Sequence, residues 1–209
     1  MKLVSDSFAN MAAIPVRFAF AEPDRDHHVR LSANRNPHLA WSGLPAGTHS
    51  LALVCHDPDA PTVADDVNQA GRVIPASLPR ADFFHWALVD LAPFGDPIAE
   101  GEFSSGVVPK GKPGPQAARG ARQGLNGYTQ WFANDKLMAG EYFGYDGPCP
   151  PWNDELVHRY VFTLYALDLK RCPVSGSFTG PDVLAAIKGH VLESAMLTGT
   201  YSLNLAHHG

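Results

Sequence analysis

LALVCHDPDAP, residues 51–61, is an apolar run that ends at a histidine and continues into two aspartates enclosed by prolines. Five apolar residues followed by a proline-bounded turn are typical of a buried strand that leads into a rigid loop. Each proline fixes its own φ angle and favours an extended conformation in the residue before it. We therefore expect Asp57 and Asp59 to be held at a strand end, which suits a functional site. The alternative is a turn whose carboxylates only accept hydrogen bonds from their own backbone.

Two later stretches also combine a strand-like run with polar residues near one end. FFHWALVDL, residues 83–91, carries His85, and YDGPCPPWNDELVHRYVFTLYALD, residues 145–168, has a Gly/Pro-rich turn followed by His158. Apolar residues on both faces of 83–91 predict a central strand, and those after His158 predict the best-defined strand of the chain. A lone histidine on a strand is usually a satisfied core or surface residue, so each stretch by itself indicates a site only weakly.

Taken together, the DPDAP, HW and GPCPP–HRY motifs resemble those of the phosphatidylethanolamine-binding protein family, in particular its bacterial Raf-kinase-inhibitor-like branch. The resemblance begins near Val16 and extends to the C-terminus. It implies a mainly β fold, a β-sandwich with long loops and a C-terminal helix, in a single domain over residues 1–209. It also implies a small anion-binding pocket at one end of the sandwich.

The resemblance implies which residues form this pocket and what they do. The two histidines and a tyrosine hydroxyl would donate hydrogen bonds to phosphate oxygens, while Asp57 would orient a histidine and favour its charged form. Binding should then be tightest on the acid side of neutrality, because unperturbed histidine titrates near pH ~6.5. The turn could present backbone N–H groups, although Cys149 stands where animal members of the family have glycine. The implied ligand-binding residues are Asp57, Asp59, Pro61, Phe83, His85, Tyr145, Gly147, Cys149, Pro151, His158 and Tyr160.

One segment predicts the C-terminal helix directly. Residues 179–196 have apolar side chains at a spacing of three and four, and Pro181 and Asp182 suit the first turn of a helix. Elsewhere the patterns predict a strand at 14–20, loops at 62–82 and 92–126, a short helix within 128–144 and a last strand at 199–205.

The composition agrees with a loop-rich β protein and argues against several classes of partner. The 209 residues include 19 Gly and 18 Pro, which favours strands joined by turns over a helical bundle. The net charge is −5 and the 16 Lys and Arg show no cluster, so we expect no nucleic-acid partner. There is neither an apolar run of about 18 residues nor the unbroken apolar segment of a signal peptide. Three cysteines do not make a disulfide framework, so we expect free thiols and a cytoplasmic location.

Two classes of function fit the motifs. In the first, the protein is a non-enzymatic binding or regulatory protein for a phosphate-type group of a phospholipid, a phosphoester or a phosphorylated partner, and the family resemblance adds a kinase or protease. In the second, it is a hydrolase that uses either a metal held by the aspartates and histidines above or the Cys149 thiol beside His158. No HExxH or comparable spacing of metal ligands occurs, and no group that would orient the thiol can be named. We therefore favour binding without a metal or cofactor; the bacterial branch also allows a homodimer.

Overall fold

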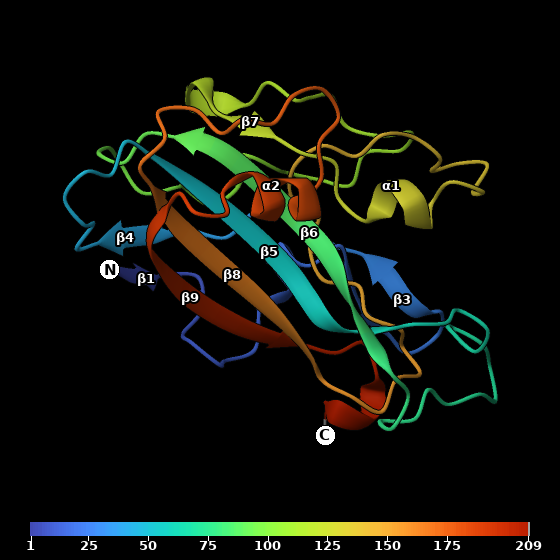
Figure 1. The fold of residues 1–209 in the computed structure, drawn as a ribbon. Helices are drawn as coiled ribbons and strands as arrows, with labels where there is room; N and C mark the ends of the chain where they lie inside the picture. Colours follow the sequence, from blue (N-terminus) through green and yellow to red (C-terminus); the bar gives the residue numbers. More distant parts are fainter. Residues whose placement is uncertain (209) are drawn as a thin grey trace.

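The computed structural model describes residues 1–208 and is built on a five-stranded antiparallel sheet (Figure 1). This main sheet has the strand order β7-β6-β5-β8-β9, and the N-terminal segment adds two small sheets, β1-β4 and β2-β3. The strands are β1 (Lys2–Val4), β2 (Ala21–Asp24), β3 (His28–Leu31), β4 (Ala40–Ser42), β5 (Ser50–Pro61), β6 (Arg80–Leu91), β7 (Arg122–Gln123), β8 (His158–Leu167) and β9 (Val191–Tyr201). The helices are α1 (Tyr128–Trp131) and α2 (Gly180–Ala186), with 3-10 turns at Val16–Phe18, Ala118–Gly120 and Leu205–His207.

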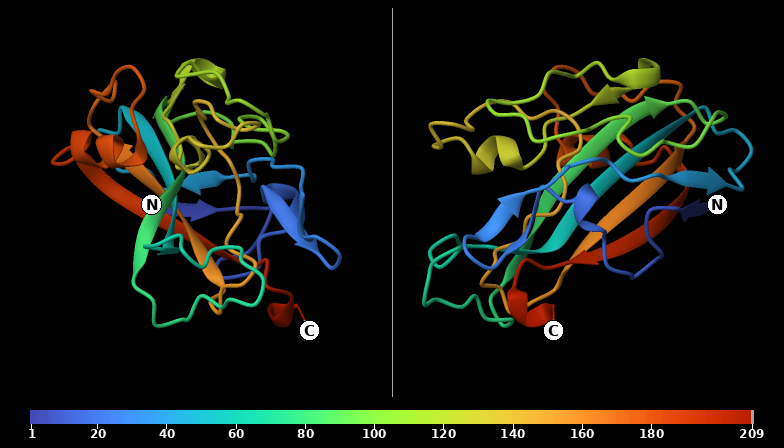
Figure 2. Two further views of the ribbon diagram at one scale, coloured as in Figure 1. Left: turned by 90° about the vertical axis from the view of Figure 1, so that its right-hand side faces the viewer. Right: turned by 180° about the vertical axis from the view of Figure 1, so that it is seen from behind.

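β5 is the central strand, and alternate residues of its apolar run enter two different cores. Leu51, Leu53 and Cys55 pack into the larger core with residues of the N-terminal segment. Ala52 and Val54 pack into the smaller core with residues of α2. Successive side chains of a strand point to opposite faces of the sheet, so a strand covered on both faces requires a continuous apolar run. Figure 2 shows this layering, with α2 on one face of the sheet and the N-terminal strands on the other.

The expected mainly β fold with long loops and a C-terminal helix is confirmed, but the helix is shorter than predicted. It begins as expected, because the Asp182 carboxylate accepts hydrogen bonds from the N–H and hydroxyl of Thr179. It ends at Ala186, and Gly189 reverses the chain with a φ of +85°. The predicted helical stretch 191–196 instead belongs to β9, and the predicted last strand at 199–205 ends at residue 201. The backbone of residues 191–196 pairs with β8, and this pairing determines their conformation although the apolar side chains have a helical spacing.

Residues 14–20 also differ from the strand that the sequence predicts. Pro15, with a φ of −59°, leads into the 3-10 turn at Val16–Phe18 instead. Directly after this turn, the N–H of Phe20 donates to the carbonyl of Pro148 at 2.9 Å. This bond places Phe20 against the Gly/Pro-rich turn of the third motif. The short helix predicted within 128–144 is present as α1.

Hydrogen bonds to the buried side chain of Asn153 hold the long loop between β5 and β6, residues 62–79, in place. The Asn153 amide donates to the carbonyls of Asp66 at 2.8 Å and Arg72 at 3.2 Å. Its oxygen accepts from the N–H of Asn68 at 3.0 Å. One side chain therefore fixes three points of the loop, so that the loop can serve as a fixed wall for the region beneath it.

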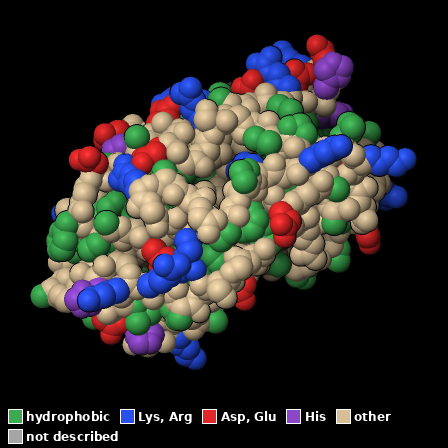
Figure 3. All heavy atoms as spheres, turned by 90° about the horizontal axis from the view of Figure 1, so that it is seen from above, with side chains coloured by type: hydrophobic (Ala, Val, Ile, Leu, Met, Phe, Trp, Pro, Cys, Tyr) green, Lys and Arg blue, Asp and Glu red, His purple; other side chains and the backbone are tan. Residues whose placement is uncertain are grey.

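The distribution of charged side chains and the state of the cysteines agree with what the composition predicts. On the face shown in Figure 3, Lys and Arg side chains are interspersed with Asp and Glu, without a large area of one sign. Cys55, Cys149 and Cys172 are all free, as expected. Across residues 1–208, none of the helices has the length and apolar character needed to cross a membrane.

Candidate ligand-binding site

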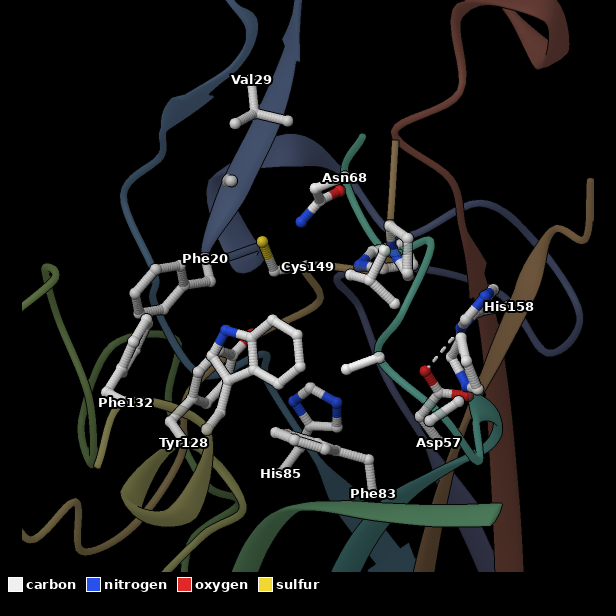
Figure 4. A pocket seen from close by; sticks show the side chains of 18 of the residues that line it. Phe20, Val29, Asp57, Asn68, Phe83, His85, Tyr128, Phe132, Cys149 and His158 are labelled. Atoms are coloured by element: carbon white, nitrogen blue, oxygen red, sulfur yellow. Dashed lines mark hydrogen bonds and ion pairs between the residues drawn. The ribbon is translucent and has the colours of Figure 1, made fainter. Parts of the chain in front are cut away.

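The three sequence motifs meet at one end of the main sheet because its strands are antiparallel. The C-terminal end of β5 lies beside the N-terminal ends of β6 and β8, with Asp57 opposite Phe83 and His56 opposite Val161. These strand ends, together with neighbouring loops, enclose a cavity of about 340 Å³ (Figure 4). Its volume is typical of sites for small molecules.

Eight of the eleven residues implied by the motifs line this cavity. They are Asp57, Pro61, Phe83, His85, Cys149, Pro151, His158 and Tyr160. Asp59 does not line it, because both oxygens of its carboxylate are bound by the Arg159 guanidinium at 2.7 and 2.9 Å. The pairing of β5 with β6 is irregular between Asp57 and Ala60. Such a bulge breaks the alternation that would have placed the two aspartates on the same face.

Tyr145 and Gly147 also lie outside the cavity, and both are structural. The Tyr145 hydroxyl donates to the carbonyl of Phe18 at 2.7 Å, and its ring is buried in the larger core. Gly147 is packed so closely that a Cβ atom there would lie 2.0 Å from the Phe18 oxygen. Its N–H donates to Asn34 at 2.8 Å and so is already used. The turn therefore does not offer the Gly147 amide to an anion.

His158 is clamped between two aspartates rather than turned toward a ligand. Its Nδ1 lies 2.7 Å from Asp57 and its Nε2 lies 3.1 Å from Asp154, and the residue is fully buried. Asp154 is bound in turn by Arg80 through two bonds of 2.5 and 3.0 Å. Ionised carboxylates only accept hydrogen bonds, so both ring nitrogens of His158 carry protons. Although burial alone would lower the pKa of His158, the hydrogen bonds to Asp154 and Asp57 raise it to about 9.

This arrangement corrects the predicted role of His158. The prediction that it donates to phosphate is wrong, because both of its N–H groups are occupied by carboxylates. Asp57 does hold a histidine in its charged form, as expected, but with Asp154 as a second partner. We call the polar side of the cavity, formed by Asp57, His85, His158 and Tyr160, its floor. The chain of Asp57, His158, Asp154 and Arg80 carries two negative and two positive charges, so this floor has little net charge.

His85 differs from His158 in both partners and charge. Its Nδ1 lies 2.7 Å from the backbone carbonyl of Asp146, which can only accept, so Nδ1 carries the proton. Burial lowers the pKa of His85, which keeps the ring neutral near pH 7. Within residues 1–208 Nε2 has no partner, yet every fully buried side-chain nitrogen or oxygen does have one. The Nε2 lone pair is therefore reached from the cavity that His85 lines.

Asp146 is fixed by three side chains behind the cavity. Its carboxylate accepts from Asn34 and Asn126, each at 2.7 Å, and lies 2.9 Å from the ammonium group of Lys112. Asp146 is almost fully buried, as are both asparagines. Its backbone N–H also donates to the carbonyl of His85 at 3.1 Å. The position of the carbonyl that binds the His85 ring is thus determined by a buried polar cluster, which the sequence motifs did not reveal.

The rest of the cavity wall is aromatic and apolar, and most of it was missed from the sequence. Phe20 stacks on Tyr128 with ring centroids 4.7 Å apart, and Tyr128 stacks on Phe132 at 5.5 Å. Leu31 and Trp131 stand at the rim, 64% and 46% exposed. These residues lie in or directly beside β2, β3 and α1, which carry no recognisable motif. Their aromatic and aliphatic character was the available signal, but it does not distinguish a cavity wall from a core.

The geometry weakens both hydrolase alternatives. His158 has no lone pair for a metal, since each nitrogen carries a proton to a carboxylate. Within residues 1–208, no three His, Cys, Asp or Glu side chains are grouped so that they could hold a metal ion. Burial raises the pKa of the Cys149 thiol to about 12, so it stays protonated and a weak nucleophile near neutral pH. His158, its predicted base, is already charged and cannot accept its proton.

The chain is similar to a well-populated group of proteins. The model of the family described as phosphatidylethanolamine-binding protein matches residues 4–202. The UPF0098 protein YbhB of Escherichia coli is 31% identical over 202 residues, which cover 97% of this chain and all of that protein. A UPF0098 protein of Methanothermobacter thermautotrophicus is 31% identical over 96% of this chain and 98% of its own length.

Solved structures agree with these sequence matches. The crystal structure of CT736 from Chlamydia trachomatis, described as a putative phosphatidylethanolamine-binding protein homologue, is 27% identical and covers 96% of both chains with a TM-score of 0.64. The structure of E. coli YbcL, at 23% identity, shares the fold with a TM-score of 0.67 over 96% of this chain and 97% of that one. On these matches, the chain belongs to the phosphatidylethanolamine-binding protein family.

Proposed function

We propose that this chain is a non-enzymatic binding protein whose cavity takes a small phosphate-type anion. Membership of the family supports a binding or regulatory role in broad terms. The observation that carries the finer proposal is that Asp57, His85 and Tyr160 line one apolar-walled cavity. Such a cavity suits a phosphate-type group that is joined to a small substituent, as in a phospholipid head group, a phosphoester or a phosphorylated partner.

Each polar residue has a definite part in this proposal. Burial raises the pKa of Tyr160 well above its usual value, so its hydroxyl keeps its proton and can donate to a phosphate oxygen. The charge of Asp57 is offset by His158, which reduces its repulsion of an anion. Pro61, Phe83, Cys149 and Pro151 contribute wall surface. A hydrolase is less well supported, because neither His158 nor Cys149 is in the protonation state that it would need.

The domain organisation, the location and the partners of the protein belong to the same proposal. We place residues 1–209 in one domain and the protein in the cytoplasm, where its three free thiols would stay reduced. A kinase or protease partner and a homodimer follow from the family resemblance alone.

Titration calorimetry with phenyl phosphate tests the pocket. Tyr160→Phe removes a donor to a charged group, which should weaken binding by about 10- to 100-fold. Tyr165→Phe is a matched control, because Tyr165 lies on the same strand but does not line the cavity. Absence of binding to the wild-type protein would refute the proposal. So would an affinity that changes equally in the two variants.

A further inference from the structure

The floor of the cavity offers a ligand more hydrogen-bond acceptors than donors. The neutral His85 ring spends its only N–H on the Asp146 carbonyl, so Nε2 presents a lone pair. The Asp57 carboxylate also only accepts; its two oxygens already receive bonds from the N–H of Asp59 at 2.7 Å and from His158 at 2.7 Å. The Tyr160 hydroxyl is the donor beside them. A fully deprotonated anion would therefore face lone pairs on two sides.

The His85 ring cannot simply exchange its proton from one nitrogen to the other. With the proton on Nε2, the bare Nδ1 would face the Asp146 carbonyl at 2.7 Å, leaving two buried acceptors without a hydrogen between them. The carbonyl cannot easily turn away, because Asn34, Asn126 and Lys112 hold the Asp146 carboxylate. Lys112 also donates to the carbonyl of the preceding residue. The cluster thus fixes which face of the imidazole a ligand meets.

We propose, building on the function proposed above, that the pocket selects phosphate monoesters that still carry one acidic proton. Phosphodiesters and sulfate monoesters carry the same single charge but no such proton, and should bind less well. The P–OH group donates to His85 Nε2, while an unprotonated oxygen accepts from Tyr160. Asn34, Lys112, Asn126 and Asp146 are positioning residues, which act on the ligand only through His85.

Near neutral pH, the proton of the hydrogen bond to His85 Nε2 comes from the ligand and not from the groups around His85. The titratable groups that face His85 are Asp57 on β5, His158 and Tyr160 on β8, Tyr128 on α1, and Asp146 and Cys149 in the turn. Burial raises the pKa of both tyrosines and of the thiol, so these three keep their protons. His158 stays charged up to about pH 9. The state of the site between pH 6 and 8 then depends on His85 and the ligand.

Calorimetry with phenyl phosphate and phenyl sulfate at pH 6 and pH 8 tests this selection. At pH 6 the phosphate should bind about 10-fold or more tightly than the sulfate, because the sulfate leaves a buried acceptor unpaired. The second ionisation of a phosphate monoester lies near pH 6, so its singly charged fraction falls from about one half at pH 6 to about 1% at pH 8. Its apparent affinity should therefore fall by about 50-fold, whereas that of the sulfate has no such ligand-based loss.

Variants and NMR separate His85 from general effects on the protein. His85→Ala should bring the two esters to similar affinities, whereas His56→Ala, on the same sheet but outside the cavity, should keep the difference. Nitrogen-15 NMR should show the His85 ring protonated at Nδ1 and bare at Nε2 at pH 7.5. Lys112→Met should reduce both this tautomer preference and the preference for phosphate, and the exposed Lys110→Met should change neither.

The outcomes distinguish this inference from the function on which it rests. Equal affinities for the two esters at pH 6, or phosphate binding that is unchanged between pH 6 and 8, would overturn the selection and leave anion binding intact. Binding of neither ester would overturn both. If Lys112→Met does not fold, the ester comparison and the NMR of the wild-type protein still decide the matter.

Discussion

Replacing Asp154 by asparagine removes one of the two carboxylates that keep His158 charged beneath the cavity. The Asp154 oxygen lies 3.1 Å from Nε2, Asp57 lies 2.7 Å from Nδ1, and the His158 side chain is fully buried. The pKa of about 9 for His158 is above the value of ~6.5 for an unfolded chain. A base whose pKa is raised by folding contributes stability that is complete below pH ~6.5. That contribution is lost as the pH rises through about 9.

The size of the effect follows from the pKa shift. At about 1.36 kcal/mol per pKa unit, the full shift of His158 corresponds to roughly 3 kcal/mol of unfolding free energy. Between pH 7 and pH 9 the wild-type protein should lose about 2 kcal/mol of this contribution. In Asp154→Asn one of the two carboxylates is gone, so the loss should be about 1 kcal/mol. The variant should also be less stable at pH 7 by roughly 3 kcal/mol, because Arg80 and His158 both lose a buried partner.

Urea unfolding at pH 7, 8 and 9, followed by tryptophan fluorescence, measures these free energies. Other groups contribute to the wild-type slope, since burial lowers the pKa of Lys112 and raises that of Cys149. Because both remain in the variant, the difference between the slopes reports on His158. Asp90→Asn is the control, because it breaks a comparable carboxylate–arginine pair, 2.6 Å from Arg122, at another place. Identical slopes for Asp154→Asn and wild type would refute the reasoning.

Three further predictions concern residues in and around the cavity. Gly147→Ala should destabilise the protein by about 3 kcal/mol or more in urea unfolding, because its Cβ would lie 2.0 Å from a backbone oxygen, whereas Gly95→Ala has open space and should be nearly neutral. Asn153→Ala should free the loop at 62–79 and speed its cleavage in limited proteolysis, with the rest of the chain unchanged. Cys149 should resist iodoacetamide at pH 8 in the folded protein and react once it is unfolded in urea, because its pKa of about 12 is a consequence of burial; fast labelling of the folded form would contradict this.

The meeting of the three motifs could be predicted because it depends on local signals and on one topological rule. Apolar runs identified β5, β6 and β8, and antiparallel pairing brings the end of one strand to the start of its neighbours. Asp57, His85 and His158 therefore share a cavity although they are far apart in the chain. The predictions that were wrong concern interactions for which the sequence carries no local signal. The bulge after Asp57 turned Asp59 away, and pairing with β8 converted the second half of a predicted helix into β9.

The role of His158 shows why residue identity could not settle the chemistry of the site. A histidine that begins a strand beside a Gly/Pro-rich turn is equally suited to donate to a ligand or to be enclosed. Whether His158 is enclosed depends on Asp154, four residues earlier, whose carboxylate can approach Nε2. In the structure this carboxylate contacts Nε2 and is held there by Arg80. Arg80 is distant in sequence from both residues. Its contribution appears only when β5, β6 and β8 are assembled.

The two histidines of the site divide between them tasks that a single residue could not perform. His158, paired on both sides, stays charged through the physiological range and offsets the charge of Asp57, which would reduce the repulsion of the proposed anion. Within the described residues, His85, held by a carbonyl and kept neutral by burial, leaves one unpaired acceptor facing the cavity. If both were charged, the floor would attract any anion of suitable size. With one charged and one neutral, it would distinguish anions by whether they bring a proton, as the proposed selection requires.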